Sequence, residues 1–156
     1  MQVVKFFFIA LFAIILSTQS VQAQYSRTVS NNIASASLAE KALSAKLALT
    51  AKGYTVIKTF NTSIQEGKTK YFTSRAFAGN EYIVVAVSER GVNDLDTEMY
   101  DSYGDLIAHD ITEGEGGLTA CEHHLRYNTT LKVEIENYDS YSSQANYDTV
   151  ILFAYR

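Results

Sequence analysis

Three neighbouring residues combine a thiol with two imidazoles, a set that can bind zinc or supply a nucleophile and a base. Cys121 and His123 share one face of an expected strand, and His124 points the other way. Residues two apart on a strand lie roughly 7 Å apart along the backbone, too far for a short hydrogen bond. Spacing marks no fourth zinc ligand, so the sequence favours a buried thiol with two rim histidines. A small hydrolase using these residues stays as an alternative.

Carboxylates dominate the stretch from Glu89 to Glu122, which holds ten acids and only one basic residue, Arg90. Ca²⁺ prefers oxygen ligands from closely spaced acidic residues on loops, although the spacing here fits no EF-hand. Aspartates in turns also serve purely local hydrogen bonding, so both interpretations stay open. The candidate ligands for Ca²⁺ are Asp94, Asp96, Asp101, Asp105 and Asp110.

Tyrosine is unusually frequent, with eleven residues, whereas tryptophan is absent. Tyrosine supplies contact area at a low cost in conformational entropy, which favours a binding surface for a protein or a glycan. Cross-strand packing is the alternative role. The candidate contact residues are Tyr100, Tyr103, Tyr138 and Tyr141.

Catalysis has little support in the rest of the chain. No glycine-rich phosphate loop, nucleophile elbow or His-Glu-x-x-His motif is present, so the chain is predicted not to be an enzyme. Without Lys5, 12 basic residues face 17 acidic ones, a net charge of −5. Nucleic acid is therefore excluded as the expected partner, because phosphate binding needs a basic surface.

The N-terminus has the features of a cleaved secretory signal. Lys5 precedes an apolar run over residues 6–16, and a polar stretch then leads to Ala23. We expect residues 1–23 to be removed before Gln24, which predicts a secreted or periplasmic protein. The apolar run is too short for a stable membrane span, and none is expected after cleavage.

The elements that carry these residues begin with one helix, predicted within residues 24–53. Ser30 or Asn31 caps it, alanine and leucine fill it to Lys52, and Gly53 ends it. It is expected to pack on its own domain through an apolar face. The predicted polar arc holds Ser37, Glu40, Lys41, Ser44 and Lys52.

From residue 54 to 156 the apolar residues alternate with a period of two, which predicts short strands. Residues 61–67 and 137–146 are expected to form a turn and a loop, and residues 101–105 a hairpin turn. Because no second helix provides a crossover, the strands predict an antiparallel β-sandwich. The predicted strands are 54–60, 69–77, 82–87, 95–101, 106–109, 118–126, 130–136 and 147–155.

Residues 68–156 resemble the bacterial pre-peptidase C-terminal domain family. The most specific segment is 93–108, NDLDTEMYDSYGDLIA, which is similar to the family's central hairpin. Thr97 stands where the family pattern has an apolar core residue. Weaker similarities lie in residues 78–85, 130–138 and 147–155.

The resemblance implies a non-catalytic, jelly-roll-like β-sandwich. Relatives usually accompany secreted peptidases, and some bind calcium, collagen-like protein or carbohydrate. We therefore expect a secreted binding or structural module with a protein or glycan ligand. A calcium-stabilised accessory module of a secreted peptidase system is the alternative that the resemblance implies.

Overall fold

The computed structural model describes residues 36–110 and 116–156. The expected signal peptide, residues 1–23, and the predicted helix start at Ser30 or Asn31 lie outside these ranges. Within them, no helix is both long enough and apolar enough to cross a membrane.

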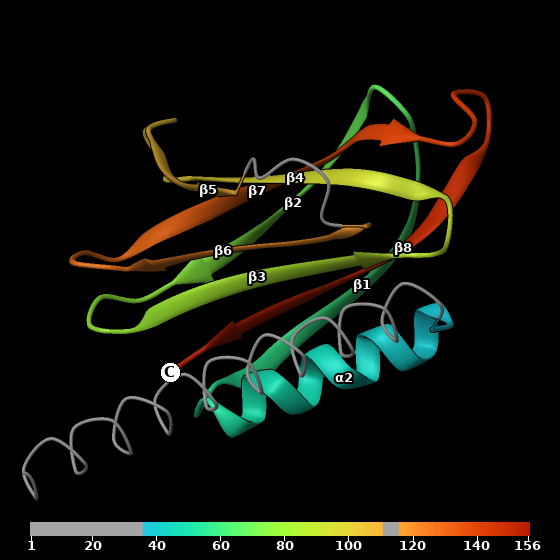
Figure 1. Cartoon of the computed structure of the whole chain (residues 1–156). Helices are drawn as coiled ribbons and strands as arrows, with labels where there is room; N and C mark the ends of the chain where they lie inside the picture. Colours follow the sequence, from blue (N-terminus) through green and yellow to red (C-terminus); the bar gives the residue numbers. More distant parts are fainter. Residues whose placement is uncertain (1–35, 111–115) are drawn as a thin grey trace, which may run out of the picture. The chain divides into compact units, whose positions relative to one another are not determined.

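Within these ranges, eight strands form two four-stranded antiparallel sheets, which confirms the antiparallel sandwich that the two-residue alternation predicts (Figure 1). We name them the helix-covered sheet and the open sheet. The helix-covered sheet has the order β1 (Thr55–Gln65), β8 (Asn146–Tyr155), β3 (Glu81–Ser88) and β6 (Leu118–His124). The open sheet has the order β2 (Lys68–Ala76), β7 (Thr129–Ser140), β4 (Val92–Tyr100) and β5 (Leu106–Asp110).

Strand pairing shows that the sandwich is one long hairpin wrapped into two layers. The first strand pairs with the last, β2 with β7, β3 with β6, and β4 with β5. The tip of this hairpin is the turn at residues 101–105. Additional β3–β8 and β4–β7 pairs complete the two sheets. This is a jelly roll, which confirms the expected fold class: mainly β, with a helix before the strands.

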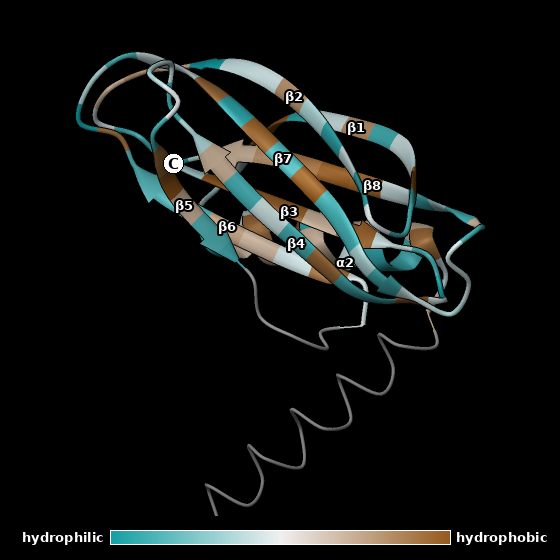
Figure 2. Ribbon diagram, turned by 90° about the horizontal axis from the view of Figure 1, so that it is seen from above, coloured by the Kyte–Doolittle hydropathy of each residue, from teal (hydrophilic) through white to brown (hydrophobic). Residues whose placement is uncertain are grey.

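Alternation along each strand places the main core between the sheets. On β7, Leu131, Val133 and Ile135 are fully buried, whereas Lys132 and Glu134 point outward, and Figure 2 shows this alternation as bands of colour. Phe153 of β8 is fully buried in this core.

Two strands are longer than predicted. Residues 61–65, predicted as a turn, belong to β1, because they pair with β8 and Ile64 is buried. Residues 137–140, predicted as a loop, belong to β7. Asn137 is fully buried there, and its side-chain nitrogen donates to the Ile64 carbonyl at 3.3 Å. These polar residues were misassigned because a buried asparagine with a partner looks like a turn residue in the sequence.

Helix α2 (Leu38–Ala51) begins at a capping box. The Ser37 hydroxyl accepts a hydrogen bond from the Glu40 backbone, and the Glu40 carboxylate accepts one from the Ser37 N–H at 2.8 Å. The backbone of Ser37 is extended, with ψ at 158°. The prediction of a single unbroken helix from Ser30 or Asn31 to Lys52 is therefore wrong, because the chain is extended at Ser37.

The helix covers the outer face of one sheet, as expected, but with a different side from the predicted one. Leu49 packs in a second apolar cluster with residues of β3 and β8. Lys41, predicted to face solvent, is buried; its Nζ donates to the Ser88 carbonyl at 2.9 Å, and burial lowers its pKa. Leu43 and Leu47 are exposed instead. Because alanine lies on every side of this helix, the sequence pattern does not indicate which side is buried.

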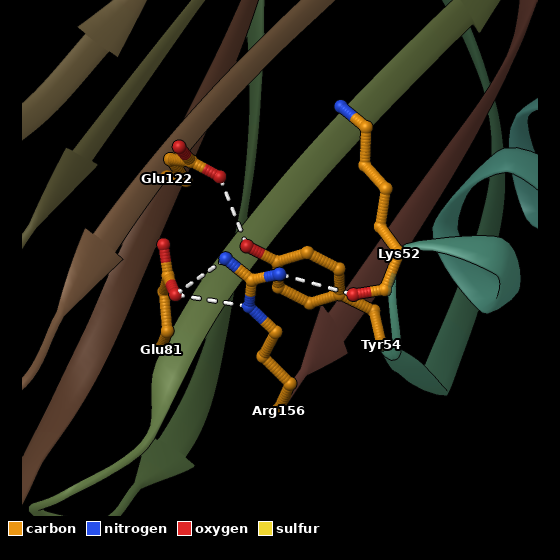
Figure 3. A network of polar contacts seen from close by, with 5 residues as sticks. All are labelled: Lys52, Tyr54, Glu81, Glu122 and Arg156. Carbon is orange, nitrogen blue, oxygen red and sulfur yellow. Dashed lines mark hydrogen bonds and ion pairs between the residues drawn. The ribbon is translucent and has the colours of Figure 1, made fainter.

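Arg156 connects the C-terminal end of α2 to the sandwich through polar contacts (Figure 3). Its guanidinium lies 4.5 Å from the centre of the Tyr54 ring and donates to the Lys52 carbonyl at 3.0 Å. It also pairs with the Glu81 carboxylate at 2.9 Å. The Tyr54 hydroxyl donates to Glu122 at 2.9 Å. Residues of β3 and β6, of the connection between α2 and β1, and the residue after β8 thus meet in one polar network.

Tyr54→Phe should lower the free energy of unfolding by about 0.5–1.5 kcal/mol near neutral pH, the net value of one hydrogen bond. Burial, followed by Glu122, raises the pKa of Tyr54 to about 12, so the folded state holds this proton more tightly than the unfolded chain. The contribution is present below about pH 10 and is lost as the pH rises toward 12. Urea unfolding at pH 8 to 12 measures it. Equal alkaline sensitivity in both proteins would contradict it.

Candidate functional site

The outer face of the open sheet is the sheet face that helix α2 leaves uncovered in the described part of the chain. Helix α2 contacts β1, β3 and β8, all of which belong to the other sheet. Two large tyrosines point outward from the open sheet: Tyr71 of β2 is 71% exposed and Tyr138 of β7 is 63% exposed. Figure 2 shows the open sheet with α2 on the far side of the sandwich.

Four carboxylates form a two-by-two block at the centre of this face. The strand register places Glu98 of β4 directly opposite Glu134 of β7, and Asp96 opposite Glu136. Side chains opposite one another across strands have Cβ atoms about 4.5–5.5 Å apart, and like charges there are destabilising. Together with Thr69 the four line a hollow of about 40 Å³. We call the block, with Tyr71, Tyr100 and Tyr138, the acidic–tyrosine face.

One pair of carboxylates has compensating partners. Glu134 forms an ion pair with Lys132, whose Nζ also lies 5.4 Å from the centre of the Tyr71 ring and 5.8 Å from that of Tyr100. Glu98 accepts a hydrogen bond from the Tyr100 hydroxyl, which raises the pKa of that tyrosine to about 12. The chain's own ammonium group thus shows how this face holds a cation, between two aromatic rings and a carboxylate.

The other pair, Asp96 and Glu136, has no hydrogen bond or ion pair within residues 36–110 and 116–156. Partial burial raises the pKa of Asp96, and the negative charges of Asp94 and Glu136 raise it further. These two carboxylates face each other at a cost to stability that nothing in the described fold offsets.

Glu136→Gln should therefore raise the free energy of unfolding by about 0.2–1 kcal/mol at pH 7, because it removes one of two opposed charges. Since the pKa of Asp96 is raised on folding, the wild-type protein gains stability as the pH falls through the titration of Asp96. This gain should shrink in the variant. Urea unfolding between pH 4 and 7 measures both effects, and a variant less stable than wild type would contradict the assignment.

The five aspartates predicted to bind calcium do not share one site. Asp101 and Asp105 lie in the turn after β4, about 16 Å or more from Asp96 along an extended strand. Asp110, at the end of β5, accepts hydrogen bonds from the Thr119 hydroxyl at 3.1 Å and the Ala120 N–H at 2.8 Å. A single ion cannot contact them all. Within the described ranges, no group of three or more His, Cys, Asp or Glu is arranged to hold a metal ion.

Asp101 has a structural role. It is buried, and its carboxylate accepts hydrogen bonds from the Tyr127 hydroxyl, the Tyr103 N–H at 2.8 Å and the Asp105 N–H at 3.0 Å. These bonds, that from Tyr127 most strongly, lower the pKa of Asp101. Its oxygens are engaged in shaping the turn.

The four predicted contact tyrosines are spread over three places. Tyr100 and Tyr138 lie on the acidic–tyrosine face, Tyr103 lies in the turn after β4, and Tyr141 follows β7 at the opposite end of the strands. They do not form one surface. Tyr71, Glu134 and Glu136 were not predicted as site residues. Their alternation along β2 and β7 was the available signal.

Cys121 is buried, and its pKa is raised to about 12, chiefly by burial and further by the charge of Asp110. His123 is half-buried and His124 is exposed. This environment opposes the thiolate that a cysteine nucleophile or a zinc ligand requires.

No family model matches the chain, and no curated protein matches it. Among solved structures, the chain is similar to PliG of Aeromonas hydrophila, a periplasmic lysozyme inhibitor of g-type lysozyme. The identity is 12% and the TM-score 0.47, and the match covers 64% of this chain and 85% of that one. At this level of similarity the neighbour's activity does not carry over.

Proposed function

We propose that this chain is an exported, non-catalytic binding module that holds a cationic protein partner on its acidic–tyrosine face. The observation that carries the proposal is the opposed pair Asp96 and Glu136, left without a polar partner in the described fold. A like-charge pair on a sheet lowers stability, and natural proteins retain such costs where function needs them.

The neighbouring tyrosines support a cationic partner. Tyr71, opposite Glu134, and Tyr138, two residues after Glu136 on β7, add exposed aromatic surface next to the carboxylates, and rings bind ammonium and guanidinium groups through their faces. Lys132 already occupies such a position inside the chain. A lysine- or arginine-rich segment of a partner would find the same chemistry beside Asp96 and Glu136.

Export and the absence of catalysis belong to the same proposal. The signal-like residues 1–23 support export to the periplasm or beyond. The buried, protonated Cys121 supports a non-enzymatic role. The resemblance to pre-peptidase C-terminal domains, also non-catalytic, is consistent with a binding module.

The test is a titration of the isotope-labelled, processed protein with a synthetic lysine-rich peptide, followed by backbone amide NMR. We expect saturable shifts confined to β2, β4 and β7, weaker at high salt because exposed charges are screened. Tyr71→Ser should weaken the binding, and Tyr141→Ser, at the far end of β7, is the matched control. Shifts spread over all acidic surfaces, or confined elsewhere, would refute the proposal.

A further inference from the structure

Three connections meet at one end of the sandwich: residues 77–80, 101–105 and 125–128 (Figure 1). The first and third are joined by hydrogen bonds. The Gly79 N–H donates to the Leu125 carbonyl at 2.8 Å, and the Leu125 N–H donates to the Asn80 carbonyl at 2.9 Å. The Ala78 N–H donates to the Asn128 side chain at 2.8 Å.

The turn at 101–105 is fixed to the same group. Its buried Asp101 accepts from the Tyr127 hydroxyl, and the Ser102 N–H donates to the Thr129 hydroxyl at 3.0 Å. Gly104 has a φ of 87°, a conformation that other residues rarely adopt. The three connections therefore form one cross-linked unit, and a surface ordered before binding loses little conformational entropy when it binds.

Each strand of the open sheet carries one exposed large side chain at this end. Tyr103, after β4, is 83% exposed and Phe77, after β2, is 58% exposed. Tyr127, before β7, and Leu106, at the start of β5, are exposed as well. Since neighbouring strands lie about 4.8 Å apart, the row of four strand ends that carry or adjoin these residues is about 15 Å long. We call this row the aromatic loop end.

The charges beside this row are mainly positive. Arg75 and Arg126 are exposed, and neither has an ion pair within the described ranges. Of the nearby carboxylates, Glu81 is paired with Arg156 and Asp101 is buried in its turn, which leaves Asp105 as the one exposed carboxylate of that turn. This stands out in a chain of net charge −4. Aromatic residues with arginine are the composition of binding hot spots.

We propose that the aromatic loop end is a second binding surface, which holds a protein partner through an apolar patch bordered by carboxylates. Charge complementarity favours an acidic partner. Arg75 and Arg126 lie beside the row, and a basic partner would place positive charges opposite them. The surface lies on connections that the acidic–tyrosine face does not use, so either proposal can fail without the other.

The test is to pan a random peptide library displayed on phage against the processed protein. We expect enriched peptides that combine aromatic or aliphatic residues with Asp or Glu. Phe77→Ser/Tyr103→Ser should weaken their binding at least about tenfold, since hot-spot truncations commonly have effects of this size. Arg75→Gln/Arg126→Gln should weaken it less and reduce its dependence on salt.

Tyr141→Ser is the matched control, because this tyrosine is exposed away from this end and outside the acidic–tyrosine face; it should bind as wild type does. Melting temperatures establish that each variant is folded. Enrichment of basic peptides, equal binding by the loop-end variant, or no enrichment above the starting library would each overturn the proposal.

Discussion

Phe153→Ala should lower the free energy of unfolding by about 3–5 kcal/mol, the usual cost of removing a buried phenylalanine. The Phe153 ring is fully buried between the sheets. Its centroid lies 5.5 Å from that of the Tyr82 ring, on which it stacks, and 5.9 Å from that of Phe72, with which it makes an edge-to-face contact. Its removal leaves a cavity where the two layers join. Urea unfolding at low temperature measures the change in midpoint.

Phe77→Ala is the matched control, because the same atoms are removed from a side chain that is mostly exposed. It should change the free energy of unfolding by no more than about 0.5 kcal/mol. Similar losses in both variants would contradict the burial of Phe153 in the core.

Thr97→Val should raise the free energy of unfolding by about 1–3 kcal/mol, the cost of a buried polar group without a partner. Thr97 of β4 is completely buried, and its hydroxyl has no hydrogen-bond partner among the residues that the structure describes. Valine has nearly the same shape and no hydroxyl to satisfy. It also restores the apolar residue that the resemblance to pre-peptidase C-terminal domains implies at this position.

The control is Thr73→Val on the exposed side of β2, where the hydroxyl reaches water. There the change should stay within about 0.5 kcal/mol. Thermal and urea unfolding compare the two variants with wild type. A destabilised Thr97→Val protein would show that the hydroxyl has a partner, such as a buried water molecule.

The two-residue alternation predicted most of the strands because the core lies on one face of them, whereas β3, which is buried on both faces, was predicted from its β-branched apolar run. It failed at the ends of β1 and β7, where buried polar residues such as Asn137 continue the ladder. The helix was predicted, but its orientation was not, since its apolar residues surround the axis. Local composition identifies an element better than it identifies which side meets a neighbour.

The candidate site could be predicted only in part, because the sequence does not fix the register in which β4 pairs with β7. Alternation places Asp96 and Glu98 on one face of β4, but not the residues opposite them on β7. That register depends on irregularities between Val92 and Leu95, and a shift of one residue would reverse every face. The predicted calcium set failed similarly, because an extended strand separates residues close in sequence.

The most direct test of the acidic–tyrosine face joins a binding and a stability measurement on one variant. Asp96→Asn/Glu136→Gln should bind the lysine-rich peptide at least about tenfold more weakly by calorimetry, as loss of two complementary charges implies. The same variant should be more stable than wild type. The control is Asp105→Asn, which changes an exposed residue of the turn after β4 and should leave the affinity for the peptide unchanged. Unchanged affinity in the double variant, or an equal loss in Asp105→Asn, would contradict the account.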